Sequence, residues 1–393
     1  MKLMTVEAAR AAMLAEIAPL GIETVPLAYA IGRVLREDVA AVRDQPPFTN
    51  SAMDGWAIRS SSGTQTLEIV GESAAGHGFE VEMQPGQAVR IFTGAALPSG
   101  ADTVVIQEDA TRAGDQLQVP ASKPGDNIRR AGKDFRAGDV LLKSGTRIDP
   151  WRLSLCASAG RADVVVAKSP RIAILSTGEE IVEAPATPGP FQIYDSGSPA
   201  LKAMVEGWGG VATKQSGIRD RLDAVVAAMR EADCDLIVTL GGASVGDHDL
   251  VRTAALELGL RFCVESVAVR PGKPTFFGVL ADGRRLLGLP GNPASAFVCA
   301  ELFLKPLIAA YRGTTAEPVM HQAPTAVDIP ANGPREHWMR ARIGVDGNVT
   351  PYGDQDSSLV SVFAGADALL RRRAGATAVS AGEMVDILRL VRG

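Results

Sequence analysis

An apolar run over residues 235–240 passes directly into a glycine-rich segment, Leu-Gly-Gly-Ala-Ser-Val-Gly-Asp-His-Asp at 240–249, and then into a helix-like pattern. This order of strand, glycine turn and helix is how α/β proteins bind phosphate groups. Glycines let the backbone approach an oxyanion, and the free N–H groups at the start of the helix point at it. Two more turns follow apolar strand patterns, Arg-Pro-Gly-Lys-Pro at 270–274 and Leu-Pro-Gly-Asn-Pro at 289–293. Three such turns predict an α/β domain with a phosphate-bearing ligand.

The size and composition of the chain exclude several classes of protein. A length of 393 residues predicts several domains, and a net charge of −5 with 46% hydrophobic residues does not suit a nucleic-acid binder. The four cysteines and four histidines lack metal-site spacing, so any metal should be a hard cation on carboxylates. No apolar run approaches the roughly 20 residues that cross a membrane. The N-terminus also lacks the uninterrupted apolar stretch of a signal peptide, because Glu7 and Glu16 lie within it. The sequence therefore predicts a cytoplasmic protein with no membrane or nucleic-acid partner.

The hydrophobic pattern changes along the chain. Apolar residues at helical spacing predict helices over 5–17 and 149–159, and the stretch between them contains β-type runs at 66–70, 88–92, 103–107 and 116–119. Strands at 172–175, 235–240, 262–269 and 286–289 then alternate with helices at 198–206, 222–231, 249–258 and 294–311, which predicts a parallel sheet. After residue 312 the β-like runs 340–343, 348–351 and 384–390 predict a small barrel or sandwich. The first β-rich stretch is therefore predicted to be an insertion.

Acidic residues follow several of the predicted strands. Glu180 comes after a strand and a glycine turn, at the carboxyl edge of the sheet where ligands of open α/β sheets bind. Asp195, Asp220 and Asp249 lie in the neighbouring loops, and Lys273 supplies a positive charge. This set suits a nucleotide-like anion with a divalent ion. Helix capping or turn formation explains Asp195 and Asp220 equally well, whereas we favour a functional role for Glu180 and Asp249.

The inserted β-rich stretch has its own polar segments, at 46–57, 90–95 and 127–134. Two arginines and a lysine in the last segment, beside backbone donors, indicate a second anion site. A solvated basic loop with Asp134 as its partner is an equally good interpretation.

Taken in order, segments 46–57, 91–95, 127–134, 176–180, 241–249, 270–274 and 289–293 resemble the MoeA family, the molybdopterin molybdenumtransferases, which is related to the C-terminal domain of gephyrin. The resemblance extends from about residue 5 to the C-terminus. It implies a multidomain α/β plus β homodimer. Its four domains would be a helical and extended linker domain (1–42 and 141–168), an inserted β domain (43–140), a MogA-like α/β domain (169–315) and a C-terminal β-barrel (316–393). The active cleft would lie between the α/β domain of one subunit and the β insert of the other.

The resemblance also implies a reaction. Family members take adenylylated molybdopterin and molybdate, place molybdenum on the dithiolene and release AMP, with Mg²⁺ as the metal. The molybdopterin adenylyltransferase and apo molybdoenzymes are candidate protein partners. The implied catalytic positions are Asp54, Thr93, Asp134, Glu180, Asp220 and Asp249, with Asp249 and Glu180 as metal ligands. The implied substrate-binding positions are Gly241, Gly242, Ser244, Gly246, Arg270, Lys273, Pro290, Pro293 and Ser357.

The chain departs from the family pattern at two positions. Gly197 stands where the family often has asparagine, and Arg270 where lysine is common, which replaces a point charge by a planar fork. Two other functions stay open. The adenylyl transfer step shares the glycine turn and the α/β domain, and a non-catalytic scaffold that binds a partner peptide belongs to a different class. The sequence also leaves the choice between molybdenum and tungsten open.

Overall fold

The computed structural model describes residues 3–241, 250–315 and 317–390 of the chain. They form two compact units, of which one contains Met1–Glu23 and Ala167–Gly393 and the other contains Thr24–Val166. The chain therefore leaves the first unit after residue 23 and returns to it at residue 167.

A six-stranded sheet lies at the centre of the first unit, in the order β17-β14-β18-β23-β22-β19. Its strands are β14 (Arg171–Thr177), β17 (Val211–Ile218), β18 (Leu236–Leu240), β19 (Arg261–Val264), β22 (Phe276–Val279) and β23 (Arg285–Leu289). The first four strands of the order are parallel, which confirms the parallel-type sheet. β22 is antiparallel to both of its neighbours, so the sheet is mixed at this edge. The sequence patterns missed both β22 and β17.

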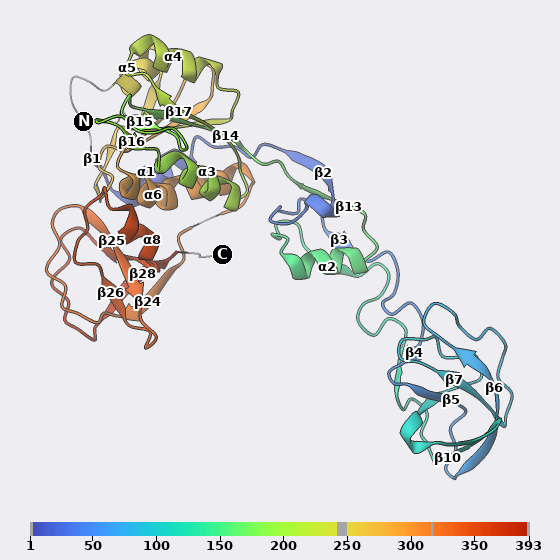
Figure 1. The fold of residues 1–393 in the computed structure, drawn as a ribbon. Helices are drawn as coiled ribbons and strands as arrows, with labels where there is room; N and C mark the ends of the chain where they lie inside the picture. Colours follow the sequence, from blue (N-terminus) through green and yellow to red (C-terminus); the bar gives the residue numbers. More distant parts are fainter. Residues whose placement is uncertain (1–2, 242–249, 316, 391–393) are drawn as a thin grey trace. The chain divides into compact units, whose positions relative to one another are not determined.

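Helices cover both faces of this sheet (Figure 1). Alternate residues of β14 point to opposite faces, as the two-residue period of a strand requires. Ile172 and Ile174 belong to one hydrophobic core, with α1 (Val6–Leu14), α3 (Gly197–Gly207) and the helical segment 293–311. Ala173 and Leu175 belong to a second core, with α4 (Leu222–Glu231) and α5 (Leu250–Glu257). The result is a three-layer α/β/α domain.

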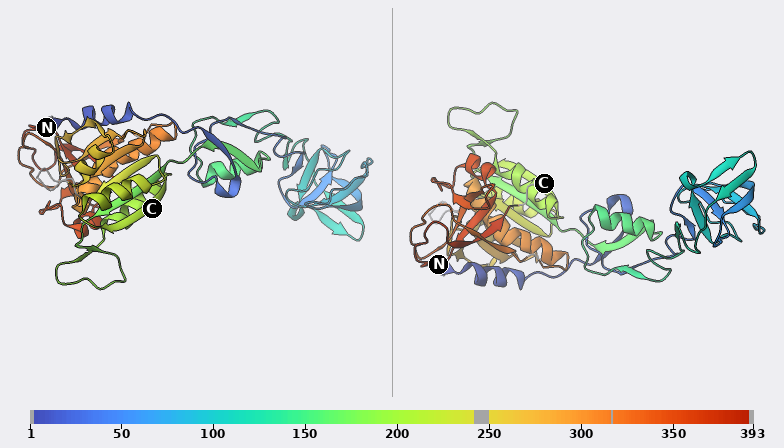
Figure 2. Two further views of the ribbon diagram at one scale, coloured as in Figure 1. Left: turned by 90° about the horizontal axis from the view of Figure 1, so that it is seen from above. Right: turned by 90° about the horizontal axis from the view of Figure 1, so that it is seen from below.

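Helix α1 packs on this domain, although the resemblance groups residues 1–42 with the linker. The side-chain oxygen of Thr5 accepts from the N–H of Ala8 and caps the helix. Val6, Ala9 and Met13 are buried in the same core as the segment 293–311, and Figure 2 shows α1 beside that segment in both views. The short strands β1 (Leu3–Met4) and β20 (Ser266–Val267) pair beside it.

The predicted helix over 294–311 is divided into three parts. A π-helical turn at Ala300–Leu304 separates α6 (Pro293–Cys299) from α7 (Lys305–Tyr311). Pro306 lies in the first turn of α7 and has no N–H to donate to the preceding turn, which accounts for the widening there. Contrary to the expectation from the sequence, the whole segment has a length and hydropathy that would allow it to cross a membrane, but 89% of its most apolar 18 residues are buried inside the protein. It is a core helix of the domain.

The C-terminal part of the first unit is a closed sheet. Its strands are β21 (Val269–Arg270), β24 (Met320–Pro324), β25 (Glu336–Ile343), β26 (Val349–Pro351), β27 (Ala368–Arg372) and β28 (Met384–Arg389), with α8 (Val360–Gly365) between β26 and β27. The sheet order is β21-β25-β27-β28-β24, and β26 pairs with β25. A bridge between Thr325 and Val349 joins the end of β24 to β26 and so closes the ring. This confirms the predicted C-terminal β-barrel.

The second unit contains a small core and a separate sheet. Strands β2 (Ile22–Pro26) and β3 (Val39–Ala40) pair with β13 (Asp163–Ala167) and β12 (Val140–Leu142), and α2 (Pro150–Ser158) packs beside them. Between these paired strands the chain forms a six-stranded sheet of β8 (Thr103–Ile106), β5 (Gly55–Ile58), β7 (Gln87–Ile91), β6 (Gln65–Ser73), β10 (Gln116–Val119) and β9 (Thr111–Ala113). The paired strands thus bracket an inserted β structure, and the exact division into four domains stays a prediction.

Candidate active site

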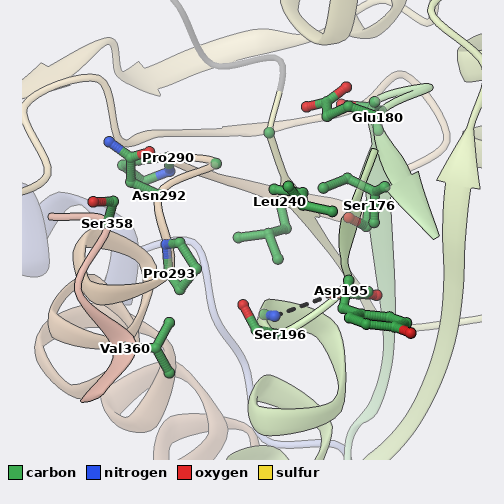
Figure 3. Close-up of a pocket in the computed structure, with 18 of the residues that line it drawn as sticks. Ser176, Glu180, Asp195, Ser196, Leu240, Pro290, Asn292, Pro293, Ser358 and Val360 are labelled. Atoms are coloured by element: carbon green, nitrogen blue, oxygen red, sulfur yellow. Dashed lines mark hydrogen bonds between the residues drawn. The ribbon is translucent and has the colours of Figure 1, made fainter. Parts of the chain in front are cut away.

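A cavity of about 1030 Å³ opens at the carboxyl edge of the central sheet, within the first unit. The ends of β14, β18 and β23 form its floor, as expected for a ligand site of an open α/β sheet. Figure 3 shows Asn292, Pro293 and Ser358 on one side of it, and Ser176, Asp195 and Glu180 on the other. Glu180, Asp220, Gly241, Lys273, Pro290 and Pro293 are predicted site residues that line it.

Gly178, two residues before Glu180, leaves room for the Glu180 carboxylate beside the cavity. Gly178 follows β14 with a φ of +132°. A Cβ built on Gly178 would lie 2.6 Å from Oε2 of Glu180 and 2.8 Å from its other carboxylate oxygen. The carboxylate therefore rests against the bare Cα of Gly178, a position that no other residue type at 178 leaves open.

Asp195 acts in this structure as the cap of helix α3. Its Oδ1 accepts from the backbone N–H groups of Gly197 (3.1 Å) and Ser198 (2.9 Å), and its Oδ2 accepts from the hydroxyls of Ser198 (2.5 Å) and Ser216 (2.6 Å). Burial opposes ionisation of the carboxylate, but these hydrogen bonds outweigh it and lower the pKa of Asp195. Of the two interpretations of Asp195, helix capping agrees with these contacts.

The position of Gly197, at the start of α3, explains one departure from the family pattern. A Cβ at this residue would lie 2.3 Å from Cδ2 of Leu240, the last residue of β18. Leu240 lines the cavity and occupies the space that a larger residue at 197 would need.

Asp220 lies on the rim of the same cavity and is exposed. Its Oδ2 accepts from the N–H of Glu179 at 3.4 Å, so it contacts the loop that carries Glu180. Among the described residues, no group of three or more His, Cys, Asp or Glu side chains converges on one point. Mg²⁺ does not require one, because it is commonly held by one or two carboxylates and by phosphate oxygens of a substrate. Glu180 and Asp220 therefore fit as partial ligands of a hard cation.

The two positively charged residues of the turn at 270–274 lie in different places. Lys273 lines the cavity, whereas Arg270 is not among the lining residues and pairs through β21 with His337 of β25. Burial, together with Arg270 and other guanidinium groups nearby, lowers the pKa of His337 to about 4. Gly272, with a φ of +120°, leaves no room for a Cβ because Sγ of Cys299 would be 2.2 Å away. The turn is therefore held against the start of the π-helical segment.

The turn at 290–293 meets the barrel at Ser357. The Nδ2 of Asn292 donates to Oγ of Ser357 at 2.8 Å, and the N–H of Ala294 donates to the Ser357 carbonyl. The structure thus brings the predicted serine to the predicted proline-glycine turn. Asn292 and Ser358 also line the cavity, although neither was predicted to be a site residue.

The glycine turn itself is only partly described. Gly241 has a φ of +93° and lies at the end of β18, where a Cβ would be 2.9 Å from the carbonyl oxygen of Thr177. The other predicted residues of this turn, Gly242, Ser244, Gly246 and Asp249, lie outside the described residues.

The second unit contains the remaining predicted residues, and there three sequence segments come together. Strand β4 (Asn50–Ser51) pairs with β11 (Ile128–Arg129), and the N–H of Ser51 donates to the Ala95 carbonyl. The segments 46–57, 91–95 and 127–134 therefore lie together in one cluster, which a shared site would require.

Asp54 and Thr93 contact each other directly in this cluster. Oδ1 of Asp54 accepts from the N–H of Thr93 at 2.7 Å and from its hydroxyl at 2.9 Å. These two hydrogen bonds lower the pKa of Asp54. Asp134 lies in the neighbouring loop, where its N–H donates to the carbonyl of Gln45.

Comparison with known proteins gives matches along almost the whole chain. Residues 4–160 match the family model described as MoeA N-terminal region (domain I and II). Residues 173–310 match a probable molybdopterin binding domain, and residues 322–390 match the MoeA C-terminal region (domain IV).

Full-length relatives and solved structures agree with these matches. A protein of Haemophilus influenzae named molybdopterin molybdenumtransferase is 35% identical over 98% of this chain and 98% of its own length. One of the same name from Nostoc sp. is 34% identical over 94% of this chain and 88% of its own length. The crystal structure of a molybdopterin biosynthesis MoeA protein from Pyrococcus horikoshii has a TM-score of 0.81 and 27% identity, and covers 99% of this chain and 100% of that one. Because the family models and the relatives both extend over nearly the full length, the chain belongs to the MoeA family.

Proposed function

We propose that this protein is a molybdopterin molybdenumtransferase, an enzyme of molybdenum cofactor biosynthesis. It takes adenylylated molybdopterin and molybdate, inserts molybdenum and releases AMP. The single observation that supports this most is the cavity at the sheet edge, where Lys273, Gly241, the proline-glycine turn at 290–293 and the acids Glu180 and Asp220 meet. Its volume of about 1030 Å³ suits a substrate larger than a nucleotide.

The residues of the cavity have complementary roles in this proposal. Lys273 and the backbone N–H groups of the glycine turn bind the pyrophosphate and stabilise the charge that develops when AMP leaves. Glu180, with Asp220 and Asp249, would hold magnesium, which when bound would supply positive charge against the phosphate oxygens. Pro290 and Asn292 form the opposite wall, and Ser357, which is not a lining residue, holds Asn292 in place. Catalysis then comes from positioning and electrostatics, with no covalent intermediate on the protein.

We infer a homodimer in which the Asp54, Thr93 and Asp134 cluster serves the cavity of the other subunit. Exposed apolar side chains in the second unit support self-association, with Trp151 83%, Tyr29 72% and Ile31 51% exposed. They lie on adjacent segments, because α2, which carries Trp151, packs on the turn Leu27–Tyr29 and the N–H of Gly32 donates to the Ile148 carbonyl. Sedimentation of a Trp151→Glu variant tests this inference, because a mass equal to that of the wild type would contradict it.

A cytoplasmic location and contacts with the adenylyltransferase and with apo molybdoenzymes belong to the same proposal. Cell fractionation and affinity capture with these two named partners test them.

The decisive assay is AMP release from adenylylated molybdopterin with magnesium, with and without molybdate, followed by reconstitution of an apo molybdoenzyme. Molybdate-dependent AMP release with recovery of molybdoenzyme activity is the expected result. Formation of pyrophosphate from ATP and molybdopterin would instead establish adenylyl transfer, and a folded protein with neither activity would indicate a scaffold.

Two neighbouring glutamates give a matched pair of variants for this assay. Glu180 lines the cavity and Glu179 does not. Glu180→Gln should lower kcat by at least 10-fold, because it removes a carboxylate from the phosphate site, whereas Glu179→Gln should leave kcat within 2-fold. Equal effects of the two substitutions would contradict the assignment of Glu180.

A further inference from the structure

Arg90, on strand β7, is a charged side chain of the second unit to which the proposed reaction gives no role. Its Nη1 donates to the carbonyl of Gly55 at 2.8 Å, and its Nη2 donates to Oε1 of Gln107 at 2.7 Å. The guanidinium lies 5.3 Å from the ring centroid of Trp56 and 4.8 Å from that of Phe92. Two hydrogen bonds and two aromatic faces therefore fix one planar group.

Three of these contacts lead to the Asp54–Thr93 pair. Gly55 follows Asp54 in the chain, and Phe92 precedes Thr93. Gln107 closes the arrangement because its own N–H donates to the carbonyl of Asp54 at 3.1 Å. Arg90 thus contacts both residues that flank the pair and the glutamine that holds the Asp54 backbone, without a direct hydrogen bond to the Asp54 carboxylate.

We propose that Arg90 is a positioning residue, which holds the Asp54 carboxylate and Thr93 in the geometry that the reaction uses. This proposal depends on the proposed function in one respect, namely that Asp54 and Thr93 take part in that reaction. The positive charge of Arg90 also favours the ionised form of Asp54 and contributes to its lowered pKa, after the hydrogen bonds from Thr93.

The chain contains a matched control for this role. The Arg112 guanidinium also lies over the Trp56 ring, at 5.9 Å, but its Nε donates to the carbonyl of Gly114 in its own turn. It therefore shares the aromatic contact of Arg90 without the hydrogen bonds toward Asp54. Loss of Arg112 tests general packing of the sheet, and loss of Arg90 tests positioning.

The experiment combines kinetics with a spectroscopic signal in the full-length protein. Arg90→Met, Arg90→Lys and Arg112→Met are compared for molybdate-dependent AMP release, and the Thr93 amide is followed by NMR in protein labelled with ¹⁵N-threonine. The Thr93 N–H donates to the Asp54 carboxylate at 2.7 Å, so its chemical shift and its hydrogen exchange report this contact.

Arg90→Met should lower kcat at least 10-fold, move the Thr93 amide resonance upfield and speed its exchange about 10-fold. Arg90→Lys should recover part of each, and Arg112→Met should change none of them. An unchanged Thr93 amide in Arg90→Met, or an equal loss in Arg112→Met, would overturn the proposal. If Arg90→Met does not fold, Arg90→Lys decides by the same amide signal, because a lysine ammonium lacks the planar fork that holds both acceptors and both rings in one geometry.

An Asp54→Asn variant tests the role of Asp54 in the reaction separately from the positioning role of Arg90. If Asp54→Asn keeps full activity, the role of Asp54 in the proposed function fails, while the effect of Arg90 on the Thr93 amide still reports positioning. If Asp54→Asn is inactive and Arg90→Met is fully active, positioning by Arg90 is refuted.

Discussion

Gly178→Ala should damage the cavity more than it damages the fold. An alanine Cβ would lie 2.6 Å from Oε2 of Glu180, and an ordinary contact begins at 3.4 Å, so the oxygen must retreat by about 0.8 Å. The carboxylate is the far end of a flexible side chain and can move. The free energy of unfolding should therefore fall mainly because an alanine at a φ of +132° is strained, which costs about 1–3 kcal/mol.

The effect on the reaction should be larger. A displacement of about 1 Å in a positioned group costs roughly 100-fold in rate. We expect kcat/KM for AMP release to fall roughly 10- to 100-fold by the same principle. The two quantities are measured by steady-state kinetics and by chemical denaturation of the same preparation.

Gly283 provides the control for backbone strain. It lies in the turn between β22 and β23 with a φ of +87°, and a Cβ there would meet no atom within 4 Å. Gly283→Ala should lose similar stability and keep its activity. If Gly178→Ala releases AMP within 2-fold of the Gly283→Ala rate, the Glu180 carboxylate does not depend on the bare Cα of Gly178 and the reasoning is refuted.

Three further predictions concern the first unit. Asp195→Asn should lower the unfolding free energy at pH 7 by roughly 2–3 kcal/mol, since the carboxylate accepts four hydrogen bonds. Because the pKa of Asp195 is lowered, its contribution is present above the unfolded value of about 3.9 and is lost as the pH falls through the lower folded value, so the difference between the wild type and the variant should shrink in denaturation curves as the pH falls below about 3.9. The pKa of His337, about 4 in the folded state, lies below its unfolded value of about 6.5, so stability should rise with pH across this window by up to about 3 kcal/mol. His337→Asn should flatten that rise in a pH series of denaturation curves, and an unchanged slope would argue against a buried neutral histidine. Removal of magnesium with EDTA should reduce AMP release more than 10-fold and its return should restore it, whereas full activity in EDTA would exclude a metal on Glu180.

Local hydrophobic patterns predicted the elements whose burial follows one period. Helix α4 has the predicted bounds, and β10 and β18 lie within a residue of theirs, because each has a clear apolar face or is wholly buried. β17 was missed since only two of its eight residues are buried, which leaves an edge strand with a polar sequence. β22 was also missed, although it is a four-residue apolar strand that pairs antiparallel with the next strand, β23.

The apolar run at 262–269 shows a second kind of limit. It was predicted as one strand, but the structure divides it among β19, β20 and β21, which pair with β22, β1 and β25. The polar residues Glu265 and Ser266 mark the first break, between β19 and β20, but a local pattern does not show that the pairing partner changes there.

The candidate site was predictable in part for the same reasons. Glycine and proline turns after strands identified Gly241, Lys273 and Pro290, because backbone requirements leave a mark in the sequence. The hydrogen bond from Asn292 to Ser357 joins residues 65 positions apart, and no local pattern predicts it. The location of Arg270 beside His337, away from the cavity lining, likewise depends on the pairing of β21 with β25.

The interruption of the first unit between residues 23 and 167 has a consequence for synthesis on the ribosome. Helix α1 is made first, but the strands and the 293–311 segment that bury Val6, Ala9 and Met13 follow more than 140 residues later. At roughly 5–20 residues per second the nascent helix waits about ten seconds or longer with its apolar face uncovered, while the contiguous residues of the second unit can fold. The N-terminal helix is therefore the part of the newborn chain that we expect a chaperone to bind.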